Sequence, residues 1–253
     1  MVAKLQGTVC VVTGAARGIG RAIAERCASE GGRVACLDVS EARLPAAVEE
    51  MRAQGFDAQG YVADVGRRDD VHAAFGKIER DFGAPIGVLV NNAVWARFQP
   101  LAEIDPGTLD RMFAVGLQGL IWTMQAAAPQ MQRRGSGSII NLCSTNAVRG
   151  MPNSIAYAAL KAGVLGLTRS AAIELSPWRI RVNAILPGMV GTPASLAQFD
   201  APTLEARVGA IPMSRFGEPA EIAAAATFLA SEDSSYIQGA EIVVDGGWTV
   251  AAG

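Results

Sequence analysis

The chain has 253 residues, of which half are hydrophobic and 18% are charged, and its formal net charge is −2 at pH 7. That length and apolar content suffice for the core of one large α/β domain. The balanced charge, without a basic stripe, gives no support to a nucleic-acid partner. No apolar stretch approaches the roughly 18 residues of a membrane-spanning helix without a glycine, proline or polar break. We therefore expect neither nucleic acid nor membrane among its partners.

Cysteine and histidine usage argues against a metal site. The single histidine, His72, has no cysteine cluster in its neighbourhood. Residues 1–7 lack the apolar run of a signal peptide, so we expect a cytoplasmic location. The four cysteines stand in apolar surroundings without a C-x-x-C pair, which is typical of buried, reduced thiols: Cys10, Cys27, Cys36 and Cys143.

Short apolar runs alternate with longer amphipathic segments along the chain. In chain order, the pattern predicts a strand at 8–13, a helix at 18–29, a strand at 33–38, a helix at 41–53, a strand at 57–62, a helix at 67–82, a strand at 86–91, a long helix at 106–133, a strand at 138–143, a helix at 155–175, a strand at 179–185, a helix at 219–230 and a strand at 241–244. A loop rich in glycine and proline spans 187–217, with a short helix at 203–208.

The predicted strands are continuous apolar runs rather than alternating ones, which is typical of strands buried on both faces. With helices between them, they predict an α/β fold, a doubly wound Rossmann-type domain with a seven-stranded parallel sheet and helices on both faces. No linker-like change in composition divides the chain. We therefore expect residues 1–253 to form one domain, with a substrate loop at about 188–217 that closes over a ligand.

The first predicted strand runs into a glycine-rich turn, T-G-A-A-R-G-I-G at 13–20, and a helix follows. Glycines allow a sharp turn and a close approach of backbone to a ligand. The helix N-terminus beyond them offers unpaired N–H groups and a partial positive charge, which suit a pyrophosphate. The turn predicts a dinucleotide site, although its spacing, G-x-x-x-G-x-G, differs from the G-x-G-x-x-G form.

Asp38 stands at the end of the second strand, where a doubly wound fold places the carboxylate that binds the adenosine ribose. A carboxylate there accepts hydrogen bonds from the ribose hydroxyls and repels a 2′-phosphate. We therefore predict NAD(H) rather than NADP(H) as the cofactor. Arg17, within the turn, points the other way, because a cation there could reach a phosphate.

Tyr157 and Lys161 form the pattern Tyr-x-x-x-Lys in a predicted helix, which places both side chains on one face, one turn apart. A free tyrosine has a pKa of about 10, and a nearby ammonium lowers that pKa toward the working pH, as general acid–base catalysis requires. Ser144 lies just past the fifth strand, at the carboxyl edge where such sheets bind ligands. Its hydroxyl can hold a substrate oxygen there.

Taken in order, these motifs resemble those of the short-chain dehydrogenase/reductase family over essentially the whole chain. The resemblance implies a single NAD(P)-binding domain in which the cofactor carries the hydride and the protein supplies orientation and electrostatics. The matching pieces are T-G-A-A-R-G-I-G at 13–20, D-V at 64–65, N-N-A at 91–93, Ser144, Tyr157 with Lys161, and P-G-M-V-G-T at 187–192.

The resemblance also implies catalytic roles for three residues. Tyr157 would exchange a proton with the substrate oxygen, and Ser144 would hydrogen-bond that oxygen. Lys161 would bind the nicotinamide ribose and lower the pKa of Tyr157.

The remaining matched segments are expected to hold the cofactor. Residues 64–65 would contact the adenine, 91–93 would line the adenosine side, and 187–192 would hold the nicotinamide carboxamide. The residues expected to bind the cofactor are Gly14, Arg17, Gly18, Ile19, Gly20, Asp38, Asp64, Val65, Asn91, Ala93, Tyr157, Lys161, Pro187, Gly188, Val190 and Thr192.

Two positions depart from the family. Gly116 stands where the family usually has an asparagine, in a pattern like V-N-x-x-G, in the helix after the fourth strand. The resemblance implies that this position helps to hold a water connecting Lys161 to solvent. Glycine can still supply the backbone part of that geometry, so we expect the relay to persist through backbone and water. Val94 follows N-N-A where glycine is common, and it would narrow the cleft.

The expected substrate pocket is mostly apolar, which favours a hydrophobic or aromatic secondary alcohol or ketone. Ser144 and Tyr157 would lie at the reacting oxygen. The other positions expected to line the pocket are Trp95, Asn146, Met151, Ile155, Met189 and 196–199.

The leading hypothesis is an NAD(H)-dependent oxidoreductase that interconverts a secondary alcohol and a ketone. A 3-oxoacyl thioester reductase, which would use NADPH and a carrier-binding basic patch, is one alternative. The other is a non-catalytic nicotinamide-binding regulator, against which the intact Ser144, Tyr157 and Lys161 weigh. By resemblance we expect a homotetramer built through the long helices and the C-terminal strand region ending at 245–248.

Overall fold

The structure of the chain, a computed structural model, describes residues 3–197 and 199–251. Its strands are short, and β1, β4 and β5 are buried at every position, as expected for strands covered on both faces. Every predicted strand is present, with bounds within two residues of those predicted: β1 Val9–Thr13, β2 Arg33–Asp38, β3 Ala58–Val62, β4 Ile86–Asn91, β5 Gly137–Leu142, β6 Ile180–Pro187 and β7 Glu241–Val244.

The strands form a seven-stranded sheet in the order β3-β2-β1-β4-β5-β6-β7. Each neighbouring pair is parallel. The order runs outward in both directions from the junction of β1 and β4, which is the topology of a doubly wound Rossmann-type sheet. The fold class predicted from the sequence is therefore confirmed.

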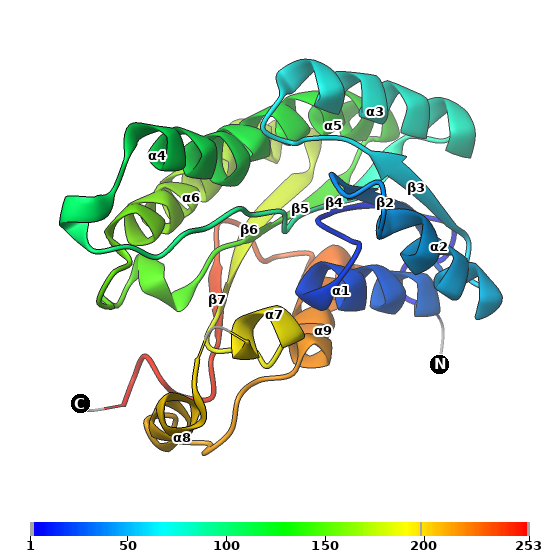
Figure 1. Ribbon diagram of the computed structural model, residues 1–253. Coiled ribbons are helices and arrows are strands. Elements are labelled where there is room, and N and C mark those ends of the chain that lie inside the picture. The colour runs from blue at the N-terminus through cyan, green and yellow to red at the C-terminus, as the bar shows by residue number, and fades with distance from the viewer. Residues whose placement is uncertain (1–2, 198, 252–253) are drawn as a thin grey trace.

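Helices cover both faces of the sheet (Figure 1). The first, second and last helices lie on one face, and the third to sixth on the other. Their bounds are α1 Gly18–Ser29, α2 Leu44–Ala53, α3 Arg68–Phe82, α4 Pro106–Phe113, α5 Gly119–Arg134, α6 Ile155–Leu175, α7 Pro193–Leu196, α8 Ala201–Gly209 and α9 Pro219–Ala230.

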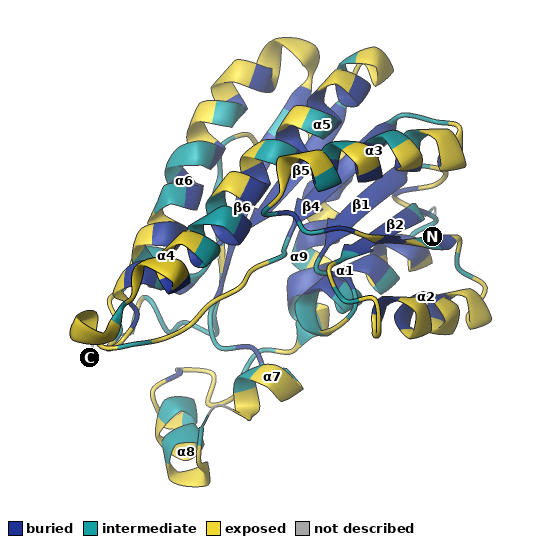
Figure 2. Cartoon of the chain, turned by 45° about the horizontal axis from the view of Figure 1, so that its top comes forward, coloured by how far each residue is buried: buried dark blue, intermediate teal, exposed yellow. Residues whose placement is uncertain are grey.

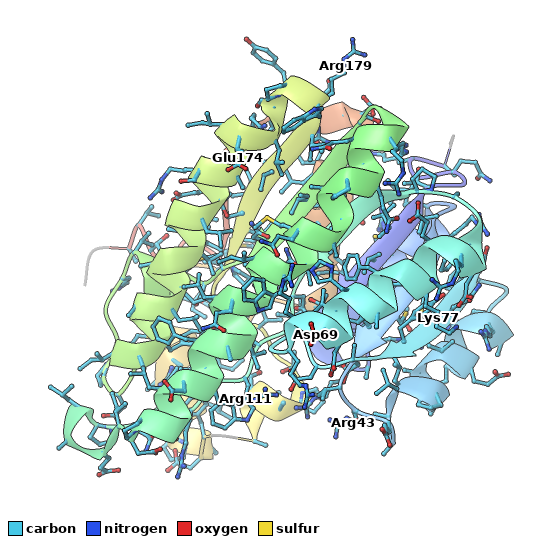
Figure 3. The ribbon with its side chains drawn as sticks, turned by 90° about the horizontal axis from the view of Figure 1, so that it is seen from above. Arg43, Asp69, Lys77, Arg111, Glu174 and Arg179 are labelled. Carbon is cyan, nitrogen blue, oxygen red and sulfur yellow. The ribbon has the colours of Figure 1, made fainter. Side chains whose placement is uncertain are left out.

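Two apolar layers fix the helices to the sheet. One layer joins Ile23 of α1 and Leu229 of α9 to one face of the strands. The other joins Phe75 of α3 and Met131 of α5 to the opposite face. Figure 2 shows the buried residues in the strands and on the helix surfaces that touch them. Charged side chains such as Lys77 of α3 lie on the outer surface (Figure 3).

The helix predicted at 106–133 is interrupted in the structure. A π-helical turn, Ala114–Gln118, separates α4 from α5. Gly116 lies within this turn and Gly119 begins α5. Glycine costs up to about 1 kcal/mol relative to alanine in a helix interior, and single π-helical turns occur frequently at functional sites. The π-helical turn is therefore centred on Gly116, the position where the family usually has an asparagine.

The loop at 188–217 contains two short helices, α7 and α8, where the sequence predicted one. α7 begins at a capping box, in which the Thr192 hydroxyl accepts from the Ser195 N–H and the Ser195 hydroxyl accepts from the Thr192 N–H. Neither helix has a buried residue among those described. Figure 2 shows α8 standing clear of the main body, at the carboxyl edge of the sheet.

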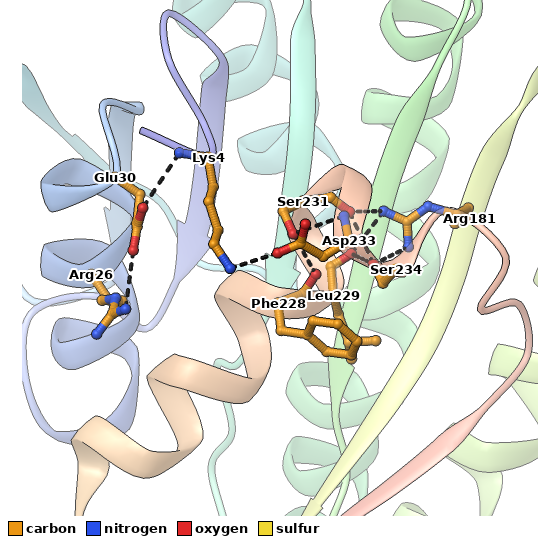
Figure 4. A network of polar contacts seen from close by, with 9 residues as sticks. All are labelled: Lys4, Arg26, Glu30, Arg181, Phe228, Leu229, Ser231, Asp233 and Ser234. Atoms are coloured by element: carbon orange, nitrogen blue, oxygen red, sulfur yellow. Dashed lines mark hydrogen bonds and ion pairs between the residues drawn. The ribbon is translucent and has the colours of Figure 1, made fainter. Parts of the chain in front are cut away.

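Polar contacts join the start of β6 to the turn after α9, at the edge of the sheet where the strands begin (Figure 4). The Arg181 guanidinium donates to the Ser231 carbonyl at 3.0 Å and to the Ser234 hydroxyl at 2.8 Å. Lys4 pairs with Asp233 in the same turn. These contacts attach the start of β6 to the end of α9. Within the described part of the chain, no helix has the length and apolar character needed to cross a membrane.

Candidate active site

A cavity of about 700 Å³ opens at the carboxyl ends of β4, β5 and β6. Open parallel sheets bind their ligands at this edge. The cavity brings together side chains from α6, from the loop after β6 and from the start of α1. The predicted catalytic residues and five further predicted cofactor residues line it: Ser144, Tyr157, Lys161, Ile19, Pro187, Gly188, Val190 and Thr192.

Tyr157 and Lys161 lie one turn apart on α6. The Lys161 Nζ is 5.7 Å from the centroid of the Tyr157 ring and donates to the Leu142 carbonyl at 2.7 Å. Ser144 follows β5, and its Oγ accepts from the Asn146 N–H at 3.1 Å and also hydrogen-bonds with Tyr157. The serine hydroxyl, the phenol and the ammonium therefore share one corner of the cavity.

Burial sets the ionisation of this corner. It raises the pKa of Tyr157 to about 12, and the hydrogen bond with Ser144 opposes this only in part. It lowers the pKa of Lys161 to about 8. The sequence analysis expected Lys161 to lower the pKa of Tyr157. Burial acts in the opposite direction, and it is the largest influence on this pKa in the structure.

The glycine-rich turn fits a bound pyrophosphate. Gly14 has a φ of +68°, and a Cβ placed on it would come within 2.8 Å of the Asn92 Nδ2. A Cβ on Gly20 would come within 2.2 Å of the Gly14 carbonyl oxygen. No side chain caps the N-terminus of α1 at Arg17, so the first N–H groups of that helix are available to an anion. Gly18 begins this helix.

Asp38 lies beside this turn at the end of β2. Its Oδ2 accepts from the Ala16 N–H at 3.0 Å, and its Oδ1 accepts from the Ser40 N–H at 2.9 Å. The two backbone donors hold the carboxylate in place, and each oxygen keeps a lone pair for a further donor. The geometry fits a carboxylate that receives ribose hydroxyls.

Asp64 and Val65 follow β3 as predicted. The Asp64 carboxylate accepts from the Gly66 N–H at 2.9 Å and from Arg111 of α4 at 2.8 Å. Arg111 is labelled in Figure 3. Val65 is buried and packs against the first residue of α5, Gly119. The turn after β3 is thus fixed by α4 and α5.

The two adjacent asparagines after β4 take different positions. The Asn91 side chain lies inside the protein, where it donates to the Asn141 Oδ1 at 2.9 Å and accepts from the Thr123 hydroxyl at 2.7 Å. Asn92 lines the cavity, and its amide donates to the Thr13 carbonyl at 2.9 Å. The sequence singled out Asn91, whereas the side chain that clamps the glycine-rich turn is Asn92. Alternation of side chains along a strand could have suggested this.

The loop after β6 is held against β7. The Gly188 N–H donates to the Val244 carbonyl at 3.0 Å, and a Cβ on Gly188 would come within 2.7 Å of the Asp245 Cβ. Val190 pairs with Gly217 across the base of the loop. These contacts fix the backbone of 187–192 where the resemblance expects the nicotinamide carboxamide.

An apolar wall faces the catalytic corner. The Phe98 ring lies 5.2 Å from the Tyr157 ring, centroid to centroid. Val94 lies on the same wall. The predicted substrate positions that line the cavity are Asn146, Met151, Met189 and Phe199.

Other predicted pocket positions lie elsewhere. Trp95 and Ile155 are exposed, at 40% and 52% of their surface, and do not line the cavity. Leu196 belongs to α7 and is likewise outside the lining. Gln198 lies outside the described residues. The segment after β4 contributes Phe98 rather than Trp95, because the Phe98 ring packs against Tyr157 of α6. This tertiary contact has no signal in the local sequence.

Two arginines that the sequence did not single out also line the cavity. Arg97 comes from the segment after β4, and Arg207 comes from α8. With Lys161 they make the lining cationic, and among its described residues there is no aspartate or glutamate. No local motif flags either arginine, because Arg97 lies in an irregular segment and the position of α8 beside the cavity depends on tertiary packing.

Gly116 contacts the helix that carries the catalytic pair. A Cβ placed on it would come within 2.6 Å of the Leu160 Cδ2. Leu160 is fully buried and immediately precedes Lys161. The leucine thus fills the space that a side chain at position 116 would need.

Metal-binding groups and disulfides are lacking in the described part of the chain. No group of three or more His, Cys, Asp or Glu residues there could hold a metal ion. The four cysteines are buried and free.

Comparison with known proteins agrees with this geometry. A protein-family model described as enoyl-(acyl carrier protein) reductase matches residues 14–249. The chain is 38% identical over 247 residues to the 3-oxoacyl-[acyl-carrier-protein] reductase FabG of Thermotoga maritima, a match that covers 98% of this chain and 100% of that protein.

Solved structures are similar over the same extent. A gluconate 5-dehydrogenase from Burkholderia cenocepacia J2315, in complex with NADP and tartrate, has a TM-score of 0.94 and 34% identity, with 99% of this chain and 98% of that one covered. An NAD+-bound xylitol dehydrogenase has a TM-score of 0.91 and 34% identity, with 96% and 100% covered. Proteins at this level of similarity therefore include both NAD-bound and NADP-bound examples.

Proposed function

Since the chain belongs to the short-chain dehydrogenase/reductase family of oxidoreductases, we propose that it interconverts a secondary alcohol and a ketone with NAD(H). The observation that carries this proposal is the shared cavity, which Ser144, Tyr157 and Lys161 line together with the loop at 187–192. A hydroxyl, a phenol and an ammonium thus lie beside the expected place of the nicotinamide.

Reduction of a ketone needs a hydride at the carbonyl carbon and a proton at its oxygen. Bound NADH would supply the hydride. The Ser144 hydroxyl would donate a hydrogen bond to the carbonyl oxygen, and the Tyr157 hydroxyl would transfer its proton to that oxygen. Oxidation runs the same steps in reverse, with Tyr157 accepting the proton.

Lys161 would stabilise the phenolate that Tyr157 becomes after giving up its proton. With a pKa of about 8, most of the lysine is protonated at neutral pH. The hydrogen bond to Leu142 holds the ammonium within reach of the ring. The positive charge of Lys161 therefore stabilises the phenolate more than the neutral phenol, so it favours the proton-transfer step.

Asp38 supports NAD(H) as the cofactor. Its carboxylate is held by two backbone N–H groups beside the glycine-rich turn, so it cannot swing away to admit a 2′-phosphate without breaking both bonds. Repulsion between the Asp38 carboxylate and the 2′-phosphate would therefore disfavour NADP(H). The apolar wall around Phe98 and Met151 supports a substrate with a hydrophobic or aromatic body.

The test measures turnover of aliphatic and aromatic secondary alcohols, and of the matching ketones, with each cofactor. We expect kcat/KM with NAD(H) to exceed that with NADP(H). Tyr157→Phe removes the transferable proton and should lower kcat by about 10²- to 10⁴-fold, with the Kd for NADH nearly unchanged in a fluorescence titration. Tyr236→Phe, the same change at a fully exposed tyrosine, is the control and should keep full activity.

The results separate the parts of this proposal. Equal or higher kcat/KM with NADP(H) would refute the NAD preference. Retention of most of the rate by Tyr157→Phe would remove the tyrosine as the proton donor. NADH binding without turnover of any substrate would favour a nicotinamide-binding regulator.

A 3-oxoacyl thioester is the second candidate substrate, and the similarity to a 3-oxoacyl-[acyl-carrier-protein] reductase favours it. The panel therefore includes a 3-oxoacyl thioester of pantetheine. A kcat/KM for this compound with NADPH far above that of every simple ketone would replace the leading proposal.

A further inference from the structure

Arg207 carries donors without an acceptor in the wall of the cavity. Its Nε is buried and has no hydrogen-bond partner among the described residues. None of the ion pairs found in that part of the chain involves it. The residue as a whole is only partly buried and lines the cavity. A ligand in the cavity can therefore approach the guanidinium and supply an acceptor.

The neighbours of Arg207 hold the guanidinium without satisfying it. Its Cζ lies 4.1 Å from the centroid of the Phe199 ring. Its Nη1 lies 3.6 Å from the Met189 sulfur, which is a weak acceptor. Stacking on a ring fixes the plane of a guanidinium and leaves its edge free to bind a planar partner. Phe199, Met189 and Arg207 all line the cavity.

The charge of the lining also favours an anion. Arg97 and Lys161 line the same cavity, and no acidic residue is among its described lining residues. A cleft lined by one sign of charge concentrates ligands of the opposite sign. The phosphates of the cofactor are expected at the N-terminus of α1, where backbone N–H groups are available to bind them. Arg207 would therefore serve a different anionic group.

We propose that Arg207 binds the carboxylate of the substrate, whose reacting carbonyl or carbinol lies at Ser144 and Tyr157. This inference rests on the proposed function and narrows it to oxo acids and hydroxy acids. The planar guanidinium can bind both carboxylate oxygens through parallel N–H donors. The apolar wall that contains Phe98 and Met151 would contact the carbon body between the two polar ends.

The test compares straight-chain oxo acids with their methyl esters, with the carbonyl at position 2, 3, 4 or 5, as substrates with NADH. For at least one chain length the wild type should favour the acid over the ester by about tenfold or more in kcat/KM. Arg207→Leu should lower kcat/KM for that acid by about 10- to 100-fold and for its ester by less than about threefold. Arg207→Lys keeps the charge but not the fork, so its loss should be intermediate.

Arg215→Leu is the matched control. Arg215 lies in the same loop, but it is paired with Glu221 at 2.7 Å and does not line the cavity. Its replacement removes the same charge at a position outside the cavity, so the acid-to-ester ratio in kcat/KM should not change. The Kd for NADH is measured for every variant, because Arg207→Leu should leave it within about twofold.

Each result decides a separate point. An acid-to-ester ratio near one in the wild type, or equal losses on acid and ester in Arg207→Leu, would overturn the carboxylate site. A parallel loss of NADH affinity would assign Arg207 to the cofactor instead. If neither charged nor neutral ketones are turned over, the proposed function fails. Calorimetric titration of 4-oxopentanoate into the NADH-bound protein then decides: tighter binding by the wild type than by Arg207→Leu supports the site, and equal binding overturns it.

Discussion

Tyr157 and Lys161 occupy a corner where burial favours the neutral form of each side chain. Burial raises the pKa of the phenol to about 12 and lowers that of the ammonium to about 8. The phenol therefore stays protonated as a donor for ketone reduction. The lysine remains mostly charged near neutral pH at an energetic cost to the fold, because a buried ammonium loses its hydration.

This cost predicts that removing the charge stabilises the protein. The folded-state pKa of Lys161, about 8, lies below the ordinary 10.5, so the unfolded chain binds the proton more tightly and the penalty is complete below pH 8. The penalty fades as the pH rises from about 8 to 10.5. After allowance for the lost hydrogen bond to Leu142, Lys161→Met should raise the free energy of unfolding at pH 7 by about 1–3 kcal/mol, while catalysis is lost.

Urea unfolding of the cofactor-free protein at pH 7 and pH 9.5 measures this effect. The gain in Lys161→Met should be smaller at pH 9.5. Lys77→Met, at an exposed lysine of α3 that pairs with Asp81, is the control. Loss of this surface pair should cost about 1 kcal/mol or less, and the same amount at both pH values. A Lys161→Met variant that is less stable than the wild type by the same amount at both pH values would show that the ammonium stabilises the fold.

Among the elements, the junction of α4 and α5 bears most directly on the site. The π-helical turn there places Gly116 against Leu160, the residue before Lys161. A larger side chain at 116 would push Leu160, and with it the turn of α6 that carries the lysine. Since Leu160 is fully buried, it has little room to move.

A double-mutant cycle tests this contact. Gly116→Asn should destabilise the fold by about 1–3 kcal/mol through overpacking, and Leu160→Ala by about 2–5 kcal/mol through the cavity it leaves. In the double variant the new side chain enters the vacated space. The double variant should therefore lose less free energy of unfolding than the sum of the two single losses, by at least about 0.5 kcal/mol. Thermal or urea unfolding of the four proteins supplies the values.

Gly76→Asn provides the control for this cycle. Gly76 lies in α3, where a Cβ would meet only the Arg80 Nη1, at 3.5 Å, so the change reports helix propensity without overpacking. It should be near neutral. Strict additivity in the Gly116 and Leu160 cycle would mean that the two positions are not coupled.

The regular elements could be predicted from the sequence because each follows a local pattern. The apolar run of β4, Ile86–Asn91, and the amphipathic pattern of α1, Gly18–Ser29, gave the observed bounds. The π-helical turn could not, since no local pattern of residues marks it. The α7 helix could have been found, because Thr192, Pro193 and Ser195 form a recognisable helix start.

Among the site residues, too, those that belong to a local sequence pattern were predictable and the others were not. Ser144, Tyr157 and Lys161 were predictable because spacing within α6 and the end of β5 brings them to one edge. Arg207 and Phe98 were not. A helix was predicted around Arg207, but its position beside the cavity depends on tertiary packing, as does that of the irregular segment that carries Phe98. The effect of burial on the pKa of Tyr157 was not predictable either, because tertiary packing creates that burial.

On the scale of the whole molecule, large apolar side chains remain exposed on several elements, including α6 and β7 at one end of the sheet. Four of them lie on α5, α6, α9 and β7: Ile121, Ile173, Phe228 and Val243. Single exposed apolar residues are common on protein surfaces, but those on α5, α6 and β7 lie on the long helices and the C-terminal strand region through which the resemblance expects assembly. We propose that the chain assembles as a homotetramer through these helices and the β7 region, as its family resemblance suggests.

Ile173 offers the sharpest test of this assembly, because 79% of its surface is exposed on the outer side of α6. A glutamate there costs little in a monomer but would bury a charge in an interface, so Ile173→Glu should lower the molar mass in multi-angle light scattering from four chains to two or one. Val62→Glu, on edge strand β3 at the other end of the sheet and 50% exposed, should leave the mass unchanged. Circular dichroism must show both variants folded. A tetramer that survives Ile173→Glu would place the interface elsewhere, and a wild type that elutes as a monomer would refute the assembly.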